Sequence, residues 1–136
     1  MRLAGAGVLA AAVVAAAGCG AAPPDLFLIK RSGDIPGARL ELLVRYNGEA
    51  RCNGHRVASI GDARLLEARD IARKLKGPAK RRVRLSPGPN SVLRYNVRVE
   101  AGSVTFSDSS PGVQPVFQRV AGFTREVAKR VCGLPR

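Results

Sequence analysis

The sequence predicts an α+β domain: an antiparallel sheet of four to five strands with two helices on one face, in the order ββ(β)-α-ββ-α. Residues 38–46 and 91–100 alternate apolar and polar side chains, as strands do when one face is buried and the other meets water. Residues 62–76 and 115–132 instead place apolar side chains at helical spacing. Helices that follow pairs of antiparallel strands gather on one face of the sheet, which gives this class.

The first strand is expected at residues 25–31, where Phe27 and Ile29 fall on one side. A turn follows at 31–37 (RSGDIPG), because glycine supplies conformational freedom and proline fixes a bend. The strand at 38–46 is then expected to direct five side chains toward the core: Ala38, Leu40, Leu42, Val44 and Tyr46.

The pair Asn47-Gly48 is a strong hairpin signal and predicts a type I′ turn. The return strand is expected at 49–52. A second turn at Asn53-Gly54 extends this strand irregularly through Val57. A third strand in the first group is therefore optional.

The first helix is expected to begin at Asp62, whose carboxylate can cap free main-chain amides. Its apolar positions recur at helical spacing: Leu65, Ala68, Ile71, Ala72 and Leu75. Gly77-Pro78 provides a stop signal, so residues 79–90 are expected to form a connection.

A second hairpin is expected from strands at 91–100 and 103–107, joined by a turn at Ala101-Gly102. Pro115 suits the first position of a helix, which is expected to end near Cys132. Gly122 lies inside this helix at a cost of up to about 1 kcal/mol against alanine. We expect close approach to the sheet to explain it.

The N-terminus is typical of an export signal. Residues 3–17 are apolar and rich in alanine, follow Arg2, and are too few to span a bilayer. Cys19 follows Ala16-Ala17-Gly18, as in the lipobox of bacterial lipoproteins, which this segment resembles. The sequence therefore predicts a signal peptide at 1–18, a lipidated Cys19 within a tether at 19–24, and a single domain at 25–136.

Two alternatives to lipidation stay open. Cleavage after Ala15-Ala16-Ala17 would give ordinary secretion, and an uncleaved segment would remain as an anchor. The expected location is the extracytoplasmic face of the cell membrane, with a diacylglyceryl group on Cys19 as the anchor, or otherwise outside the cell.

With Cys19 acylated, Cys52 and Cys132 form an even pair in an oxidising compartment, which favours a disulfide. They lie 80 residues apart, so the chain-entropy model gives the crosslink about 4 kcal/mol. The alternative is a metal site or a catalytic thiol. Two cysteines and His55 make no convincing zinc set, so no metal and no cofactor is predicted.

The chain has 23 basic and 10 acidic residues. Seven of the basic residues fall within twelve positions that contain no acid: Arg73, Lys74, Lys76, Lys80, Arg81, Arg82 and Arg84. In an exported protein this run favours an anionic lipid, a wall polymer or an acidic envelope protein as partner, and not nucleic acid. The alternative is that these charges complement the helix dipole and keep a loop solvated.

A second basic surface is expected on the outer face of the sheet, from four arginines: Arg39, Arg45, Arg94 and Arg98. Catalysis has little support in the sequence. His55 follows a turn pair and is expected to be exposed, and residues 107–110 (SDSS) lack the context of a nucleophile loop. No catalytic residue is predicted, and the protein is not expected to be an enzyme.

The chain after Pro24 resembles small actinobacterial secreted lipoproteins of unknown function. The resemblance lies in RSGDIPGARLELLV, RCNG, LLEARDIARKL, SPGPN and FSDSSPGVQPVFQRV. A weaker resemblance is to emfourins, small inhibitors of thermolysin-like metalloproteases, at Arg31, Ser32, Gly33, Gly37, Tyr95 and Asp108. We therefore expect a non-catalytic interaction module of the cell envelope, with protease inhibition as the alternative.

Overall fold

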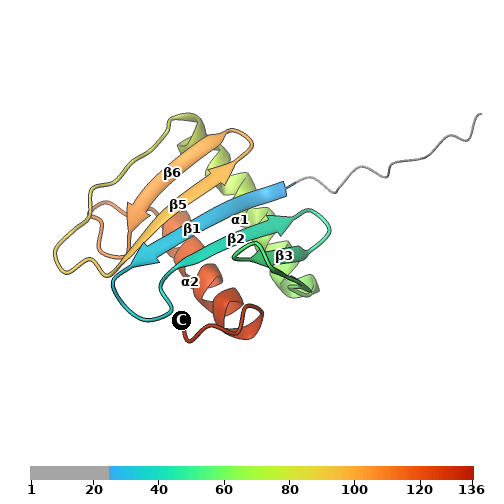
Figure 1. Ribbon diagram of the computed structural model, residues 1–136. Helices are drawn as coiled ribbons and strands as arrows, with labels where there is room; N and C mark the ends of the chain where they lie inside the picture. Colours follow the sequence, from blue (N-terminus) through green and yellow to red (C-terminus); the bar gives the residue numbers. More distant parts are fainter. Residues whose placement is uncertain (1–24) are drawn as a thin grey trace, which may run out of the picture.

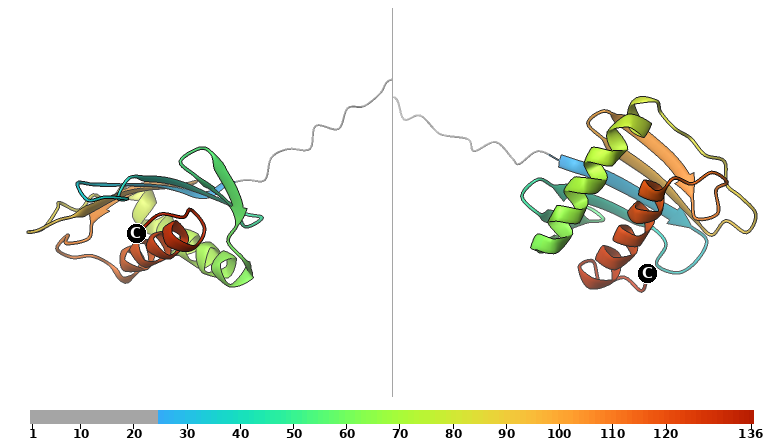
Figure 2. Two further views of the ribbon diagram at one scale, coloured as in Figure 1. Left: turned by 60° about the horizontal axis from the view of Figure 1, so that its bottom comes forward. Right: turned by 180° about the vertical axis from the view of Figure 1, so that it is seen from behind.

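The computed structural model describes residues 25–136, which form an antiparallel sheet of six strands and two helices (Figure 1). The elements in chain order are β1 (Asp25–Gly33), β2 (Leu40–Arg45), β3 (Glu49–Cys52), β4 (Arg56–Ser59), α1 (Asp62–Lys80), β5 (Leu93–Val99), β6 (Gly102–Ser107) and α2 (Pro115–Arg130). The order of strands across the sheet is β4-β3-β2-β1-β5-β6. Both helices lie on the same face, as Figure 2 shows from the side. The predicted α+β class is confirmed.

The prediction of four to five strands is too low by at least one strand, because residues 56–59 form a regular strand and not an irregular extension. Asn53 and Gly54 both have positive φ, which closes a tight turn and returns the chain as β4. The main-chain N–H of Asn53 donates to the carbonyl of Glu41 at 2.8 Å, and the Glu41 N–H donates to Asn53 Oδ1 at 2.8 Å. These two bonds fix the turn against β2.

The first hairpin also differs in its turn. Val44 pairs with Ala50, and only Gly48 in the connecting loop has positive φ, so the loop contains three residues and is not type I′. The prediction that Tyr46 points inward is wrong as well: its side chain is exposed, because β2 ends one residue earlier and Tyr46 belongs to the loop.

The boundaries of α1 differ from the sequence prediction at both ends. Gly61 with φ of 79° is the N-cap, and Asp62 is the first helical residue with no side-chain capping bond. At the other end the helix continues through Gly77-Pro78 to Lys80. A proline inside a helix costs about 3 kcal/mol. Pro78 and Ala79 are both buried, and the carbonyl of Ala79 lies against Gly102 of the β5–β6 hairpin.

The second helix, α2, covers the sheet with one apolar stripe. Its buried apolar residues are Val116, Phe117, Val120, Phe123, Val127 and Ala128. The expected reason for Gly122 is wrong: a Cβ at this position would meet no atom within 4 Å. The glycine is therefore not required by close approach to the sheet.

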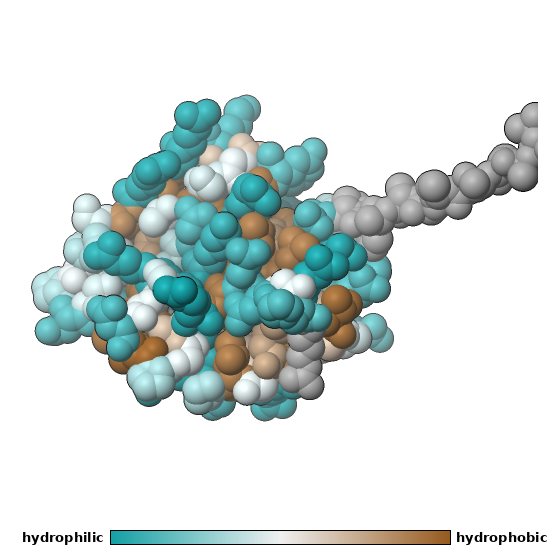
Figure 3. Space-filling model, viewed as in Figure 1, coloured by the Kyte–Doolittle hydropathy of each residue, from teal (hydrophilic) through white to brown (hydrophobic). Residues whose placement is uncertain are grey.

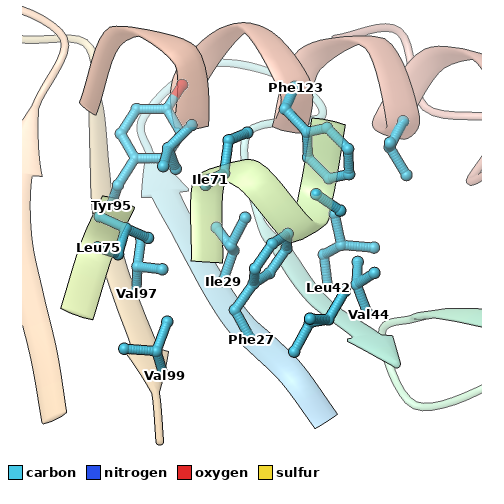
Figure 4. Packing of buried hydrophobic residues seen from close by; sticks show 14 of the residues in the cluster. Phe27, Ile29, Leu42, Val44, Ile71, Leu75, Tyr95, Val97, Val99 and Phe123 are labelled. Atoms are coloured by element: carbon cyan, nitrogen blue, oxygen red, sulfur yellow. The ribbon is translucent and has the colours of Figure 1, made fainter. Parts of the chain in front are cut away.

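The core lies between the sheet and the two helices (Figure 4). Phe27 from β1 meets Phe123 from α2 edge to face, with ring centroids 5.6 Å apart. Three aromatic rings form a stack, in which Phe106 lies between Tyr95 and Phe117. The ring centroids are 4.9 Å apart in each pair. These contacts join both halves of the sheet to α2.

A disulfide joins Cys52 at the end of β3 to Cys132, which follows α2. The predicted pairing is confirmed. The strands, both helices and this crosslink surround one hydrophobic core built from residues 25–136.

Candidate functional site

The seven predicted basic residues lie on the last two turns of α1 and on the segment that leaves it. All seven side chains are exposed: Arg73, Lys74, Lys76, Lys80, Arg81, Arg82 and Arg84. Lys80 belongs to the helix and not to the connection, because α1 extends beyond the predicted stop.

The structure divides this run into two groups. Arg73 and Lys74 both pair with Asp70 one turn earlier on α1, and Arg119 of α2 donates to the same carboxylate. The Lys74 Nζ lies 3.0 Å from Asp70 Oδ2. These two cations therefore take part in an ion-pair cluster that joins the helices, which the sequence could not reveal because Arg119 is 49 residues away.

The cluster predicts a pH-dependent stability. Hydrogen bonds from Arg119, Lys74 and Arg73 hold the pKa of Asp70 well below its ordinary value of 3.8. Because the pKa is depressed in the folded state, the stabilisation is complete above about pH 4 and is lost as the pH falls through the folded-state pKa. We expect Asp70→Asn to lower the urea midpoint of unfolding at neutral pH. The difference between the midpoints of the wild type and the variant should narrow only below about pH 4.

The control for this prediction is Asp34→Asn, which removes an exposed carboxylate that has no ion pair among residues 25–136. This variant should leave the urea midpoint of unfolding nearly unchanged at neutral pH and also below about pH 4. A carbon-13 titration of the Asp70 carboxyl carbon tests the pKa directly, and a midpoint near 3.8 would contradict the cluster.

We call the other five cations the basic end of α1: Lys76, Lys80, Arg81, Arg82 and Arg84. Within residues 25–136 no carboxylate lies within ion-pair distance of them. Lys80 lies in the last turn of α1, where a cation complements the partial negative charge of the helix C-terminus. That effect reaches only the last turn, so it does not explain Arg82 and Arg84.

The main chain holds this basic end in place. Arg82 takes a positive φ of 54°, which turns the chain out of the helix. The segment that follows joins the edge of the sheet, because Thr105 N–H donates to Val83 and Leu85 N–H donates to Thr105. Gly102 packs directly on the carbonyl of Ala79, where a Cβ would lie 2.4 Å from the oxygen. The charges are therefore presented on a fixed frame.

The C-terminal end of α1 lies beside the β5–β6 turn, at the end of the sheet where β1 starts (Figure 1). The segment that follows runs along the edge of the sheet, so Arg84 lies level with Lys30 in the middle of β1. Asp25 and Leu26 line a cavity of about 250 Å³ together with Arg73 and Lys76 of α1 and the β5–β6 turn at Glu100. The residue that follows the predicted tether thus lies beside the last turns of α1.

The predicted arginine surface lies on the open face of the sheet, which Figure 3 shows largely covered by hydrophilic side chains. Arg39, Arg94 and Arg98 are exposed there. Arg45 is half-buried and pairs with Glu49 at 3.2 Å and with Asp25 at 3.8 Å. Three of the four arginines are therefore available on this face.

The structure places His55 on the surface, in the turn between β3 and β4, as expected. Ser107 and Ser110 bond to each other and to the main chain of the turn after β6, with Ser107 N–H donating to Ser110 Oγ at 2.8 Å. Within residues 25–136 no group of three or more His, Cys, Asp or Glu side chains lies together as metal ligands would.

One residue of functional interest was missed. Arg31 was expected where the first strand meets the turn, but β1 continues to Gly33 and the Arg31 side chain is only 2 % exposed. The only signal in the sequence was its position in the apolar alternation of Phe27 and Ile29, which puts residue 31 on the buried face.

Comparison with family models, with curated proteins and with solved structures found no match. The resemblances to secreted lipoproteins and to emfourins therefore stay predictions. The predicted signal peptide, Cys19 and the tether lie outside the described residues. Among residues 25–136 neither helix has the length and apolar character needed to cross a bilayer.

Proposed function

We propose that the protein is a lipid-anchored, non-catalytic module on the extracytoplasmic face of the cell membrane, whose domain docks on anionic lipid through the basic end of α1. The observation that carries this proposal is the position of unpaired cations at the same end of the domain as Asp25.

The anchor restricts how the domain meets the membrane. Cys19 and Asp25 are only six positions apart, and a fully extended chain spans at most about 22 Å over six residues. An acylated Cys19 therefore keeps the Asp25 end close to the lipid headgroups. Each Lys or Arg near an anionic leaflet contributes about 1 kcal/mol of binding, so the five cations of the basic end can hold this orientation.

The anchor is tested by expressing the full chain in a bacterium and locating it. We expect the wild-type chain in the membrane fraction, with the mass of a diacylglyceryl group on Cys19, and Cys19→Ser in the soluble extracytoplasmic fraction. A wild-type chain without lipid, released in the same way as the variant, would refute the anchor.

The docking surface is tested with oxidised residues 25–136 and vesicles that contain or lack anionic lipid. Arg81→Glu/Arg82→Glu should lower partitioning onto anionic vesicles at least a hundredfold, because the two substitutions change the charge near the leaflet by four units. Binding by the wild type should also weaken as salt is raised.

The matched control is Arg94→Glu/Arg98→Glu, which makes the same charge change with exposed arginines of β5 on the open face of the sheet. It should retain most of the wild-type binding. Equal losses in the two variants would show that net charge alone drives binding. A larger loss in the control would assign docking to the sheet face, and a wild type that binds a soluble polyanion but no vesicle would indicate a wall polymer.

A further inference from the structure

A second site lies away from the basic end of α1, around the buried guanidinium of Arg31. In the sheet Arg31 faces Tyr95 of β5 on one side and Leu40 of β2 on the other. Its Nε donates to the carbonyl of Ala38 at 2.8 Å, and Nη2 donates to the main-chain oxygens of Gly37 at 2.9 Å and Arg136 at 2.8 Å.

Among the described residues no side-chain carboxylate pairs with Arg31. In the segment 25–136 its one negative partner is the α-carboxylate of Arg136, which accepts from Nη2. Within residues 25–136 no aspartate or glutamate lies within ion-pair distance of it, and Nη1 is a buried donor with no hydrogen-bond acceptor. Burial lowers the pKa of Arg31; the neighbouring Tyr95 side chain opposes this shift, and the charge of Arg136 adds to it. A buried cation is costly unless it is paired, and a buried donor left without an acceptor costs about 1 to 3 kcal/mol.

Arg31 forms part of the wall of a cavity of about 350 Å³ between the sheet, α2 and the end of the chain. Leu93, Tyr95, Ala121 and Pro135 give this cavity its apolar surface. The Tyr95 side chain points its hydroxyl toward α2, as Figure 4 shows. The cavity has the size of a small-molecule pocket at the lower end of the usual range.

Three further cations surround this pocket: Arg125 and Lys129 of α2, and Arg136. The one acidic residue in its wall is Asp108, and that carboxylate is occupied by main-chain donors: Val92 N–H at 3.1 Å and Leu93 N–H at 3.1 Å. In the segment 25–136 four cations thus face two carboxylates that are already engaged, those of Asp108 and of Arg136 at the chain end. The pocket keeps an excess of positive charge and attracts anions.

We propose that this pocket binds a small organic carboxylate, with its charged end against Arg31 and its apolar body against Leu93 and Ala121. The ligand carboxylate would accept from Nη1, the one guanidinium nitrogen of Arg31 without an acceptor, in a charge-assisted hydrogen bond. The apolar walls favour an organic acid over inorganic phosphate, which would leave them without a partner. The proposal is independent of the membrane anchor, because the pocket is built within residues 31–136.

The test uses nitrogen-15-labelled residues 25–136, oxidised, titrated with sodium 4-methylpentanoate. We expect saturable shifts of the Arg31 Nε–H signal and of the Leu93 and Ala121 amides at millimolar ligand. Inorganic phosphate and the neutral 4-methylpentanamide should produce much weaker shifts. Equal shifts with the amide would show only an apolar cavity, and equal shifts with phosphate would show only a general attraction of anions. Either result, or no saturable shift, would overturn the proposal.

Because Arg31 also supports the turn after β1, the variant Arg125→Gln/Lys129→Gln is used to weaken the site. Both residues are exposed and have no ion pair among the described residues, so the fold should be unaffected. We expect about tenfold weaker binding of 4-methylpentanoate. The control Arg130→Gln removes the next cation on α2, which pairs with Glu126 at 3.0 Å, and it should bind as wild type. Equal weakening in both variants would contradict a built site.

Discussion

Removing the Cys52–Cys132 disulfide is expected to lower the free energy of unfolding by about 4 kcal/mol. The crosslink closes a loop with a sequence separation of 80 residues. In the reduced denatured state this loop is released, and the additional chain entropy favours unfolding. The loop contains α1, β5, β6 and α2, so most of the fold lies inside the crosslink.

The measurement is urea unfolding of residues 25–136 with the double substitution Cys52→Ala/Cys132→Ala, compared with the oxidised wild type. Chemically reduced wild type is the second reference, because it keeps both side chains and loses only the covalent bond. Both should lose similar stability. A loss below about 1 kcal/mol in both would show that the denatured ensemble is already restricted without the bond.

The second large effect is expected from Phe117→Ala, which should cost about 3 to 5 kcal/mol. Phe117 is fully buried in the first turns of α2 and stacks on Phe106 with ring centroids 4.9 Å apart. Truncation to alanine removes the contact of α2 with the β5–β6 hairpin and leaves a cavity, because the stacked Tyr95 and Phe106 cannot both move into it.

The free energy of unfolding from urea titration measures this cost. The control is Leu66→Ala on α1, where the side chain is 66 % exposed and the loss should be below about 0.5 kcal/mol. A similar small loss for Phe117→Ala would contradict the packing of α2 on the sheet.

Several features of the fold were predictable because they depend on neighbours along the chain. The alternation of Leu40, Leu42 and Val44 identified β2, and that of Tyr95, Val97 and Val99 identified β5, since side chains alternate between the faces of any strand. The disulfide followed from an even pair of cysteines in a chain whose N-terminus predicts export.

Other features depended on contacts that no local pattern contains. Gly77-Pro78 is a stop signal in an isolated helix, yet α1 continues to Lys80, where Ala79 packs against Gly102 of a hairpin that comes later in the chain. The strand at 56–59 exists because β3 offers it a free edge, although its own sequence has a weak alternation.

The candidate sites likewise combine features that a local pattern predicts with features that only distant contacts produce. The sequence alone determined that a basic run is present at residues 73–84 and that Arg31 lies at a position in phase with buried neighbours. Only the tertiary structure decided that Asp70 and Arg119 engage part of the basic run, and that Arg31 faces a pocket without a side-chain counter-ion. The physical reason is range: periodicity records which face of an element is buried, whereas the balance of charge at a site depends on residues that only folding brings together.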